Sequence, residues 1–308
     1  MASLRTCIRL LVLLVPVALH AQPDSETPPT ESGVLEVAYP AGLFYGVDIN
    51  DARAATKVWV QRLIERNQEV AGSETIIYYD LASIEGAIRA KRVDLITLHP
   101  ADYVKLRDRI ELKPLAVAVS NGNVYERHGL ITHRASSIKT LGQLRGKRLL
   151  IQTGGKGGLP DMWLDVQLRK QGLPPAKSFF GDVARVPGIG KAVLPVFFQN
   201  ADACMLSLDA FGTMAEMNPQ LEEELRPLIT SPQYCKFLVC VRPDIYERKL
   251  HRYIDDSLTS LHTDPQGQQL LALFRVDKLV PFEQAHLDNV LALMQEFEAL
   301  DSAAGGNP

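Results

Sequence analysis

The sequence alternates short runs of β-branched and apolar residues with segments whose apolar residues recur at helical spacing. Runs such as Thr75–Tyr79 and Val93–Leu98 predict strands, and a segment with helical periodicity follows each of them. In the segment that begins near Asn50, the residues Ala55, Trp59 and Leu63 recur every fourth position and therefore share one face. Strands that alternate with helices favour a mostly parallel sheet with helices on both faces. The sequence therefore predicts an α/β fold.

This alternation occurs in two sets, separated by a turn cluster at Ser120-Asn121-Gly122-Asn123. The predicted strands cover residues 35–39, 75–79, 93–98, 115–119, 129–133, 148–152, 179–186, 201–207, 228–231 and 236–241. The predicted helices include one capped by Ser83, others at 161–171, 191–199 and around 218–224, and C-terminal helices near 244–262, 265–274 and 282–300.

The length of 308 residues, 46% of them hydrophobic, is enough for two moderate cores. We therefore predict two lobes, each with a mixed, mostly parallel sheet, and a chain that crosses between them twice. Lobe I comprises residues 34–136 and 228–302, lobe II comprises residues 137–227, and residues 303–308 form a flexible tail. Ligands of α/β sheets bind beyond the carboxyl ends of the strands, which here face a cleft between the lobes.

The N-terminal residues predict export. Arg5 and Arg9 precede an apolar block at 10–19, and Leu19-His20-Ala21 is an acceptable cleavage site, which together are typical of a signal peptide at 1–21. The block is too short to cross a bilayer and contains Pro16, which argues against the alternative of an uncleaved anchor. Residues 22–33, rich in Pro, Ser, Thr and acids, predict a disordered leader. The mature protein is therefore expected to be exported.

Several function classes are disfavoured by composition and motifs. The 33 Lys and Arg residues against 36 Asp and Glu give no basic excess for nucleic acid. The sequence has no G-x-S-x-G, H-E-x-x-H or C-x-x-C motif, and His128 and His133 are five positions apart on a predicted strand, which points them to opposite faces. We predict no catalysis, no metal site and no cofactor.

Three cysteines remain after the predicted signal peptide, and an odd number leaves at least one thiol free. Cys235 and Cys240 are five positions apart in one predicted strand and would face opposite sides of it. This spacing favours buried thiols over a bridge between them, although bridging of Cys204, Cys235 or Cys240 stays open at this point.

A glycine-rich segment follows the predicted strand at 148–152 and precedes a predicted helix. Glycines let the backbone approach a ligand closely, and their N–H groups together with the positive end of the helix suit an oxyanion. The alternative is a flexible surface loop with a solvated lysine. The predicted anion site comprises Thr153, Gly154, Gly155, Lys156, Gly157 and Gly158.

Three segments carry a resemblance to a known family. They read SIEGAIRAKRVDLITLHPADYVKL, HGLITHRASSIKTLGQLRGKRLL and AVLPVFFQNADACMLSLDAFGTMAEMNPQL. In this order they resemble the phosphate, phosphite and phosphonate substrate-binding proteins of ABC importers, over residues 35 to about 237. The resemblance implies the two-lobed type II periplasmic-binding-protein fold.

The resemblance also locates family positions in this sequence. The Ser-Thr-Ser run of phosphonate-binding members falls at Lys156-Gly157-Gly158, so backbone amides remain where the hydroxyls are missing. Family aromatic residues fall at Leu81 and Leu98, and a pocket acid falls at Gly190. Asp202 corresponds to the Asp of a Val-Asp pair in the family.

Four further residues are candidates for the cleft. His99 ends a predicted strand and is either an anion donor that titrates near neutral pH or a surface imidazole. Asp202 either orients a ligand or serves as a cap or hinge residue. Tyr39 and Tyr45 follow the first predicted strand and either close the cleft or pack in the core.

These observations predict an exported solute-binding protein that captures a small oxyanion, similar to phosphate or phosphonate, for an inner-membrane ABC permease. The alternative is a periplasmic sensing component that docks on a membrane sensor kinase. The sequence does not separate the two, because both need the same closure around a ligand.

Overall fold

A computed structural model describes residues 34–44, 48–66, 72–152, 158–250 and 254–305. The segments expected to form the signal peptide and the leader lie outside these residues. None of the helices in the described ranges combines the length and the apolar character that a membrane span needs. Two large mixed sheets and a two-stranded sheet organise the described residues.

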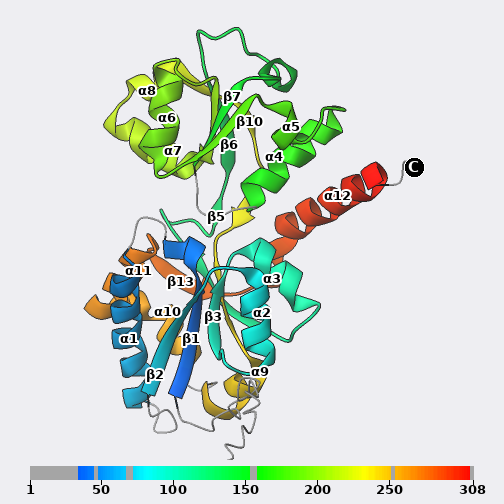
Figure 1. The fold of residues 1–308 in the computed structure, drawn as a ribbon. Coiled ribbons are helices and arrows are strands. Elements are labelled where there is room, and N and C mark those ends of the chain that lie inside the picture. Colours follow the sequence, from blue (N-terminus) through cyan, green and yellow to red (C-terminus); the bar gives the residue numbers. More distant parts are fainter. Residues whose placement is uncertain (1–33, 45–47, 67–71, 153–157, 251–253, 306–308) are drawn as a thin grey trace, which may run out of the picture. The chain divides into compact units, whose positions relative to one another are not determined.

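The larger sheet has six strands in the order β13-β4-β12-β3-β1-β2 (Figure 1). β1 pairs in parallel with β2 and β3, whereas β12 and β13 run antiparallel to their neighbours. The strands are β1 (Val34–Pro40), β2 (Gly72–Tyr78), β3 (Leu95–Leu98), β4 (Lys113–Val119), β12 (Leu238–Val241) and β13 (Lys278–Pro281).

Alternating side chains cover both faces of this sheet. In β1, Ala38 belongs to one hydrophobic cluster, and its neighbours Val37 and Tyr39 belong to another. Both sets are buried, so the strands read as continuous apolar runs. Helices α2 (Leu81–Arg89) and α3 (Pro100–Arg107) contribute to the first cluster, and α1 (Ile49–Arg66), α10 (Ile254–Thr259) and α11 (Pro265–Leu273) to the second.

The second sheet has five strands in the order β10-β6-β9-β7-β8. β7 lies parallel to β8 and β9, and β6 lies antiparallel to β9 and β10. The strands are β6 (His128–His133), β7 (Arg148–Gln152), β8 (Asp182–Val186), β9 (Ala203–Ser207) and β10 (Leu225–Thr230). The helices of this part are α4 (Leu159–Lys170), α5 (Ala176–Phe179), α6 (Ile189–Phe197), α7 (Leu208–Met217) and α8 (Gln220–Glu224).

Two short strands connect the sheets. β5 (Tyr125–Glu126) lies between β4 and β6 in the sequence, and β11 (Tyr234–Cys235) lies between β10 and β12. They pair with each other in antiparallel orientation. The chain therefore passes from the six-stranded sheet to the five-stranded sheet and back through this one pair.

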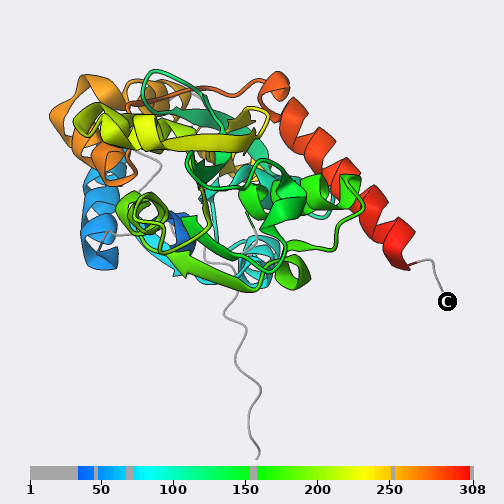
Figure 2. The ribbon, with the colours of Figure 1, turned by 90° about the horizontal axis from the view of Figure 1, so that it is seen from above.

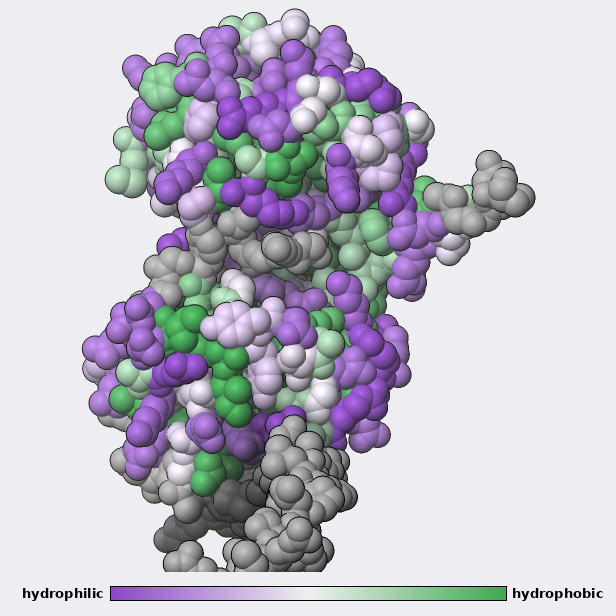
Figure 3. Space-filling model, viewed as in Figure 1, coloured by the Kyte–Doolittle hydropathy of each residue, from purple (hydrophilic) through white to green (hydrophobic). Residues whose placement is uncertain are grey.

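The C-terminal helix α12 (Asp288–Gly305) packs against α3 and α4. In both ribbon views its last turns extend away from the strands (Figures 1 and 2). The turn before it, residues 284–287, packs on β11. On the face shown in Figure 3, the exposed residues are mainly hydrophilic, with scattered hydrophobic ones.

Several elements differ from the sequence-based expectations. The run from Cys235 to Cys240 was expected to lie in one strand, but Cys235 lies in β11 and Cys240 in β12, in different sheets. β8 begins only at Asp182, because the preceding aromatic pair Phe179–Phe180 is buried at the end of the short helix α5. Asp80, not Ser83, caps α2, since its carboxylate accepts the Ser83 amide at 2.7 Å.

The strands also change sheet at other residues than the predicted lobe boundaries. β6, expected at the end of the first lobe segment 34–136, pairs with β9 and β10 in the five-stranded sheet, and β10 extends past the expected return at residue 228. Residues 303–305, expected in a flexible tail, belong to α12. β13 was not expected, because four residues without strong alternation carry little local signal.

Candidate functional site

A cavity of about 970 Å³ lies at the carboxyl ends of strands from both large sheets. Its wall includes Pro40 at the end of β1, Tyr78 at the end of β2 and Ser120 just after β4 from the six-stranded sheet. From the five-stranded sheet it includes Gln152 at the end of β7 and Ser207 at the end of β9. This is the edge at which open α/β sheets bind ligands.

Five helices begin on the wall of this cavity, because each follows a strand that ends there. They are α2, α3, α4, α6 and α7, whose first residues or N-caps line the cavity. Asp80 caps α2 with its side chain, but the N-caps of the other four make no side-chain capping hydrogen bond: His99, Gly158, Gly188 and Ser207. The first amides of a helix carry partial positive charge and need acceptors, so this wall favours an anion.

The charged side chains of the described wall do not add a net positive charge. Three are cationic, Arg185, Lys236 and Arg275, and five are acidic: Asp80, Asp102, Glu126, Asp161 and Asp209. Arg185 binds Asp161 with an Nη2–Oδ1 distance of 2.6 Å, and the Lys236 ammonium lies 3.7 Å from an Asp209 oxygen. The groups of this wall that can attract an anion are therefore mainly the main-chain amides at the helix starts.

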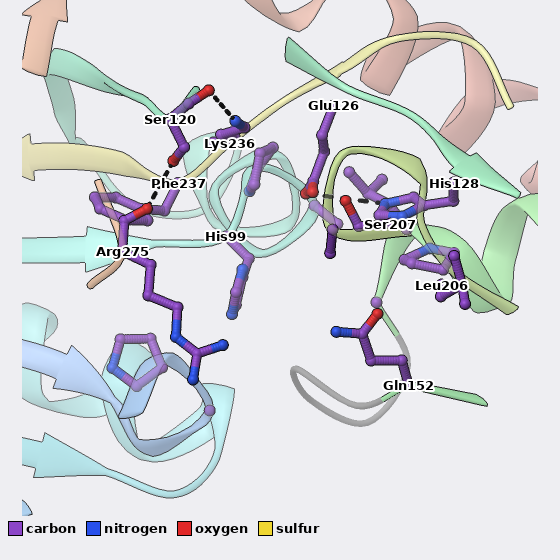
Figure 4. Close-up of a pocket in the computed structure, with 18 of the residues that line it drawn as sticks. His99, Ser120, Glu126, His128, Gln152, Leu206, Ser207, Lys236, Phe237 and Arg275 are labelled. Atoms are coloured by element: carbon purple, nitrogen blue, oxygen red, sulfur yellow. Dashed lines mark hydrogen bonds and ion pairs between the residues drawn. The ribbon is translucent and has the colours of Figure 1, made fainter. Parts of the chain in front are cut away.

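Glu126 is the acidic residue of the wall that lies beside a histidine. Its Oε1 lies 3.9 Å from Nε2 of His128. Burial lowers the pKa of His128, so the ring is neutral at physiological pH and does not form an ion pair with Glu126. The Glu126 carboxylate points into the cavity in the close-up (Figure 4).

His99 and Gln152 line the cavity from opposite sheets (Figure 4). The His99 ring follows β3 and precedes Pro100 of α3, as the sequence predicted. Its Nε2 atom and the Oε1 atom of Gln152 are both covered and have no hydrogen-bond partner among the described residues. Burial lowers the pKa of His99, and nearby Asp102 and Glu126 only partly oppose this effect.

Two predicted site residues lie away from the cavity wall. The Tyr39 ring packs between Phe44 and Phe274, with centroid distances of 5.4 Å to each, and its hydroxyl accepts a hydrogen bond from Thr56. Asp202 precedes β9, at the opposite edge of the sheet, where its carboxylate accepts the Arg148 amide at 2.9 Å. A strand start and a strand end lie at opposite edges of a sheet, which is why Asp202 and the cavity are separate.

The remaining predicted residues divide into two groups. Gly158 lines the cavity as the N-cap of α4. Tyr45, Thr153, Gly154, Gly155, Lys156 and Gly157 lie outside the described residues, so their roles stay predictions.

Sequence reasoning missed Gln152, Glu126, Lys236 and Arg275 as cavity residues. The available signal for Gln152 was its position, since a polar residue that ends an apolar strand faces the ligand edge of the sheet. Glu126 and Lys236 flank the two crossings between the sheets, and only the pairing of β5 with β11 brings them to the same cavity.

The three cysteines of the described residues are buried and unbridged. Burial raises the pKa of the Cys235 thiol to about 12 and also raises that of Cys204 and Cys240, so all three thiols stay protonated and unreactive. This confirms the preference for buried thiols. No three His, Cys, Asp or Glu side chains gather as metal ligands in the described ranges.

Comparison with solved structures identifies the fold. XAC2383 from Xanthomonas citri bound to ATP has a TM-score of 0.66 and 17% identity, covering 88% of this chain and 99% of that chain. A binding protein component of an ABC phosphonate transporter, PA3383 from Pseudomonas aeruginosa, has a TM-score of 0.60 and 15% identity, covering 89% of each chain. PhnD1 from Prochlorococcus marinus in complex with methylphosphonate has a TM-score of 0.59 and 13% identity, covering 86% of this chain and 98% of that chain. These likenesses confirm the predicted type II periplasmic-binding-protein fold.

A family match covers most of the sequence. Residues 61–287 match the family described as ABC transporter, phosphonate, periplasmic substrate-binding protein. This is a family of binding proteins rather than enzymes, and it supports delivery to an importer but gives no support to the sensor-kinase alternative. The match confirms the resemblance that the three quoted segments indicated. The chain belongs to the family of periplasmic substrate-binding proteins of ABC phosphonate transporters.

Proposed function

We propose that this protein binds a small oxyanion of the phosphate and phosphonate class in the cavity between its two sheets and delivers it to an inner-membrane ABC permease. The observation that carries the proposal is the convergence of four helix N-termini without side-chain caps on one cavity wall. Each such terminus offers amide donors and about half a positive charge. A small oxyanion accepts several of these amides at once.

The polar side chains of the wall support a ligand that is anionic but not highly charged. Arg185 and Lys236 are already engaged with Asp161 and Asp209. A polyanion would need free cations to offset the five wall carboxylates, whereas a compact anion needs only the amides at the helix starts. Lys156, in the glycine-rich sequence ahead of α4, supplies a further cation in our proposal.

Closure around the ligand is the second part of the proposal. We assign the six-stranded sheet and its helices to lobe I and the five-stranded sheet to lobe II, with β5 and β11 as the joint between them. Hinges of binding proteins are a few residues that absorb the change in backbone angles. Both crossings of the chain are concentrated in this pair.

The binding proposal is tested by thermal unfolding of the purified protein with methylphosphonate, phosphate, phosphite, methanesulfonate and acetate. An anion present at 100 times its dissociation constant is expected to stabilise the folded state by about 2.7 kcal/mol, which raises Tm measurably. Lys156→Ala should weaken a bound anion, and Lys177→Ala, which removes an exposed lysine after α4, is the matched control. If none of these anions raises Tm above sodium chloride of equal ionic strength, the proposal is wrong.

Export through a cleaved signal peptide is also part of the proposed function. The sequence places the cleavage after Ala21. Mass spectrometry of protein recovered from the periplasm is expected to find a chain that begins at Gln22. A periplasmic chain that still carries residues 1–21 would contradict this step.

A further inference from the structure

Among the described residues, three covered polar atoms of the cavity wall have no hydrogen-bond partner: His99 Nε2, Gln152 Oε1 and Asp209 Oδ2. The first two side chains enter the cavity from different sheets, His99 after β3 and Gln152 at the end of β7 (Figure 4). A covered polar atom without a partner destabilises the folded state, so folded proteins keep few of them. Asp209 Oδ2 lies 3.7 Å from the Lys236 ammonium, whereas His99 Nε2 and Gln152 Oε1 have no such partner among the described residues. This difference indicates that a ligand supplies the partners of His99 and Gln152.

The chemistry of the two atoms differs. Gln152 Oε1 is a carbonyl oxygen and only accepts hydrogen bonds. The neutral imidazole of His99 offers one donor and one acceptor nitrogen. A donor at Nε2 suits a side chain that faces an anionic ligand. Their combined requirement is therefore a ligand that carries an unprotonated oxygen and also an O–H group.

We propose that His99 and Gln152 select an oxyanion that retains one proton: His99 Nε2–H donates to a bare oxygen of the ligand, and its O–H donates to Gln152 Oε1. The ligand class is then a phosphonate or phosphate monoanion rather than a sulfonate, which carries no proton near neutral pH. This inference rests on the proposed oxyanion site and adds which protonation state the site binds.

The surrounding charges are compatible with this selection. Asp102 and Glu126 act on the His99 ring, and the cations of the wall are Arg275 and those in the two ion pairs described above. Two carboxylates close to His99 disfavour a second negative charge on the ligand.

The test is calorimetric titration of the purified protein with methylphosphonate and with methanesulfonate between pH 5.5 and 8.5. At pH 6, methylphosphonate is expected to bind about 100-fold or more tightly than methanesulfonate, because a site built for a ligand O–H rejects an analogue without it. Above the second pKa of methylphosphonate, its affinity should fall about tenfold per pH unit, as the competent monoanion is depleted.

Two variants separate the roles. Gln152→Met removes the acceptor at similar volume, so it should weaken methylphosphonate about tenfold or more and bring the two ligands closer in affinity. His99→Phe removes the donor, so it should weaken both ligands by a similar factor and leave their ratio unchanged. Gln220→Met, at an exposed position on α8, is the control and should change neither affinity.

The Tm of each variant without ligand shows whether the substitution acts on binding rather than on folding. Removing an unpaired covered polar atom should leave the Tm of the free protein equal to or above that of the unchanged chain. Equal affinity for both ligands, affinity that rises with pH, or a Gln152→Met variant with an unchanged ratio would each overturn this inference while the oxyanion site stands. If neither ligand binds, the proposed function fails and this inference fails with it.

Discussion

At the scale of single residues, Glu36 shows how the sheet edge opposite the cavity responds to pH. It lies directly beside Glu74 in the parallel pair β1–β2, and its amide donates to the Asp94 carboxylate at 2.9 Å. Burial, then repulsion from Asp94 and Glu74, raises the pKa of Glu36 from 4.5 to about 7. The folded protein therefore holds this proton more tightly than the unfolded chain does.

This shift predicts a pH-dependent gain from Glu36→Gln. Because the folded-state pKa lies above the unfolded value, the free energy of unfolding falls as pH rises from about 4.5 to 7. The variant removes that loss and should be more stable by about 1 kcal/mol at pH 8, after allowing for solvent screening of a partly exposed group. At pH 4 the two proteins should be nearly equal in urea unfolding.

The matched control for Glu36 is Glu111→Gln, which changes an exposed carboxylate. It should alter stability little at either pH. A gain from Glu36→Gln that is the same at pH 4 and pH 8 would contradict the electrostatic origin of the effect.

At the scale of elements, two ion pairs that differ in their contribution to stability hold α12 against α4. Arg169 on α4 is mostly buried, bonds to Asp301 and lies with its guanidinium carbon 5.2 Å from the Phe297 ring centroid. Lys170 binds Glu296, but both side chains are exposed. Exposed pairs contribute little, whereas a guanidinium that combines an ion pair with an aromatic face contributes more.

We therefore predict that Arg169→Met lowers the free energy of unfolding by about 1 kcal/mol, and that Lys170→Met lowers it by about 0.5 kcal/mol or less. Chemical denaturation of the two variants under identical conditions measures the difference. Equal losses would show that the aromatic contact and the burial of Arg169 add nothing to the ion pair.

At the scale of the whole molecule, the short β5–β11 pair joins the two large sheets. If the proposed lobes close on a ligand, saturating methylphosphonate should reduce the radius of gyration measured by small-angle X-ray scattering. Sodium chloride at equal ionic strength is the control. Saturation with an unchanged radius would separate binding from closure and contradict the lobe proposal.

The same scale explains what the sequence could predict. β7 has the predicted bounds 148–152, because its centre, Leu149–Ile151, is a buried apolar run and the signal is local. The antiparallel places of β12 and β13 depend on pairing with strands more than a hundred residues away, which no local pattern records. For the same reason His99 was found from its strand end, whereas Glu126 and Lys236 emerge only once the crossings pair.

The convergence of uncapped helix starts on the cavity has a consequence for how this site diverges. Amide donors belong to every residue except proline, so mutation of side chains there leaves the attraction for negative charge in place. In our proposal, the choice among anions depends instead on a few side chains such as those of His99 and Gln152. The main chain of this wall thus provides the general affinity for anions, and its side chains provide the selectivity among them.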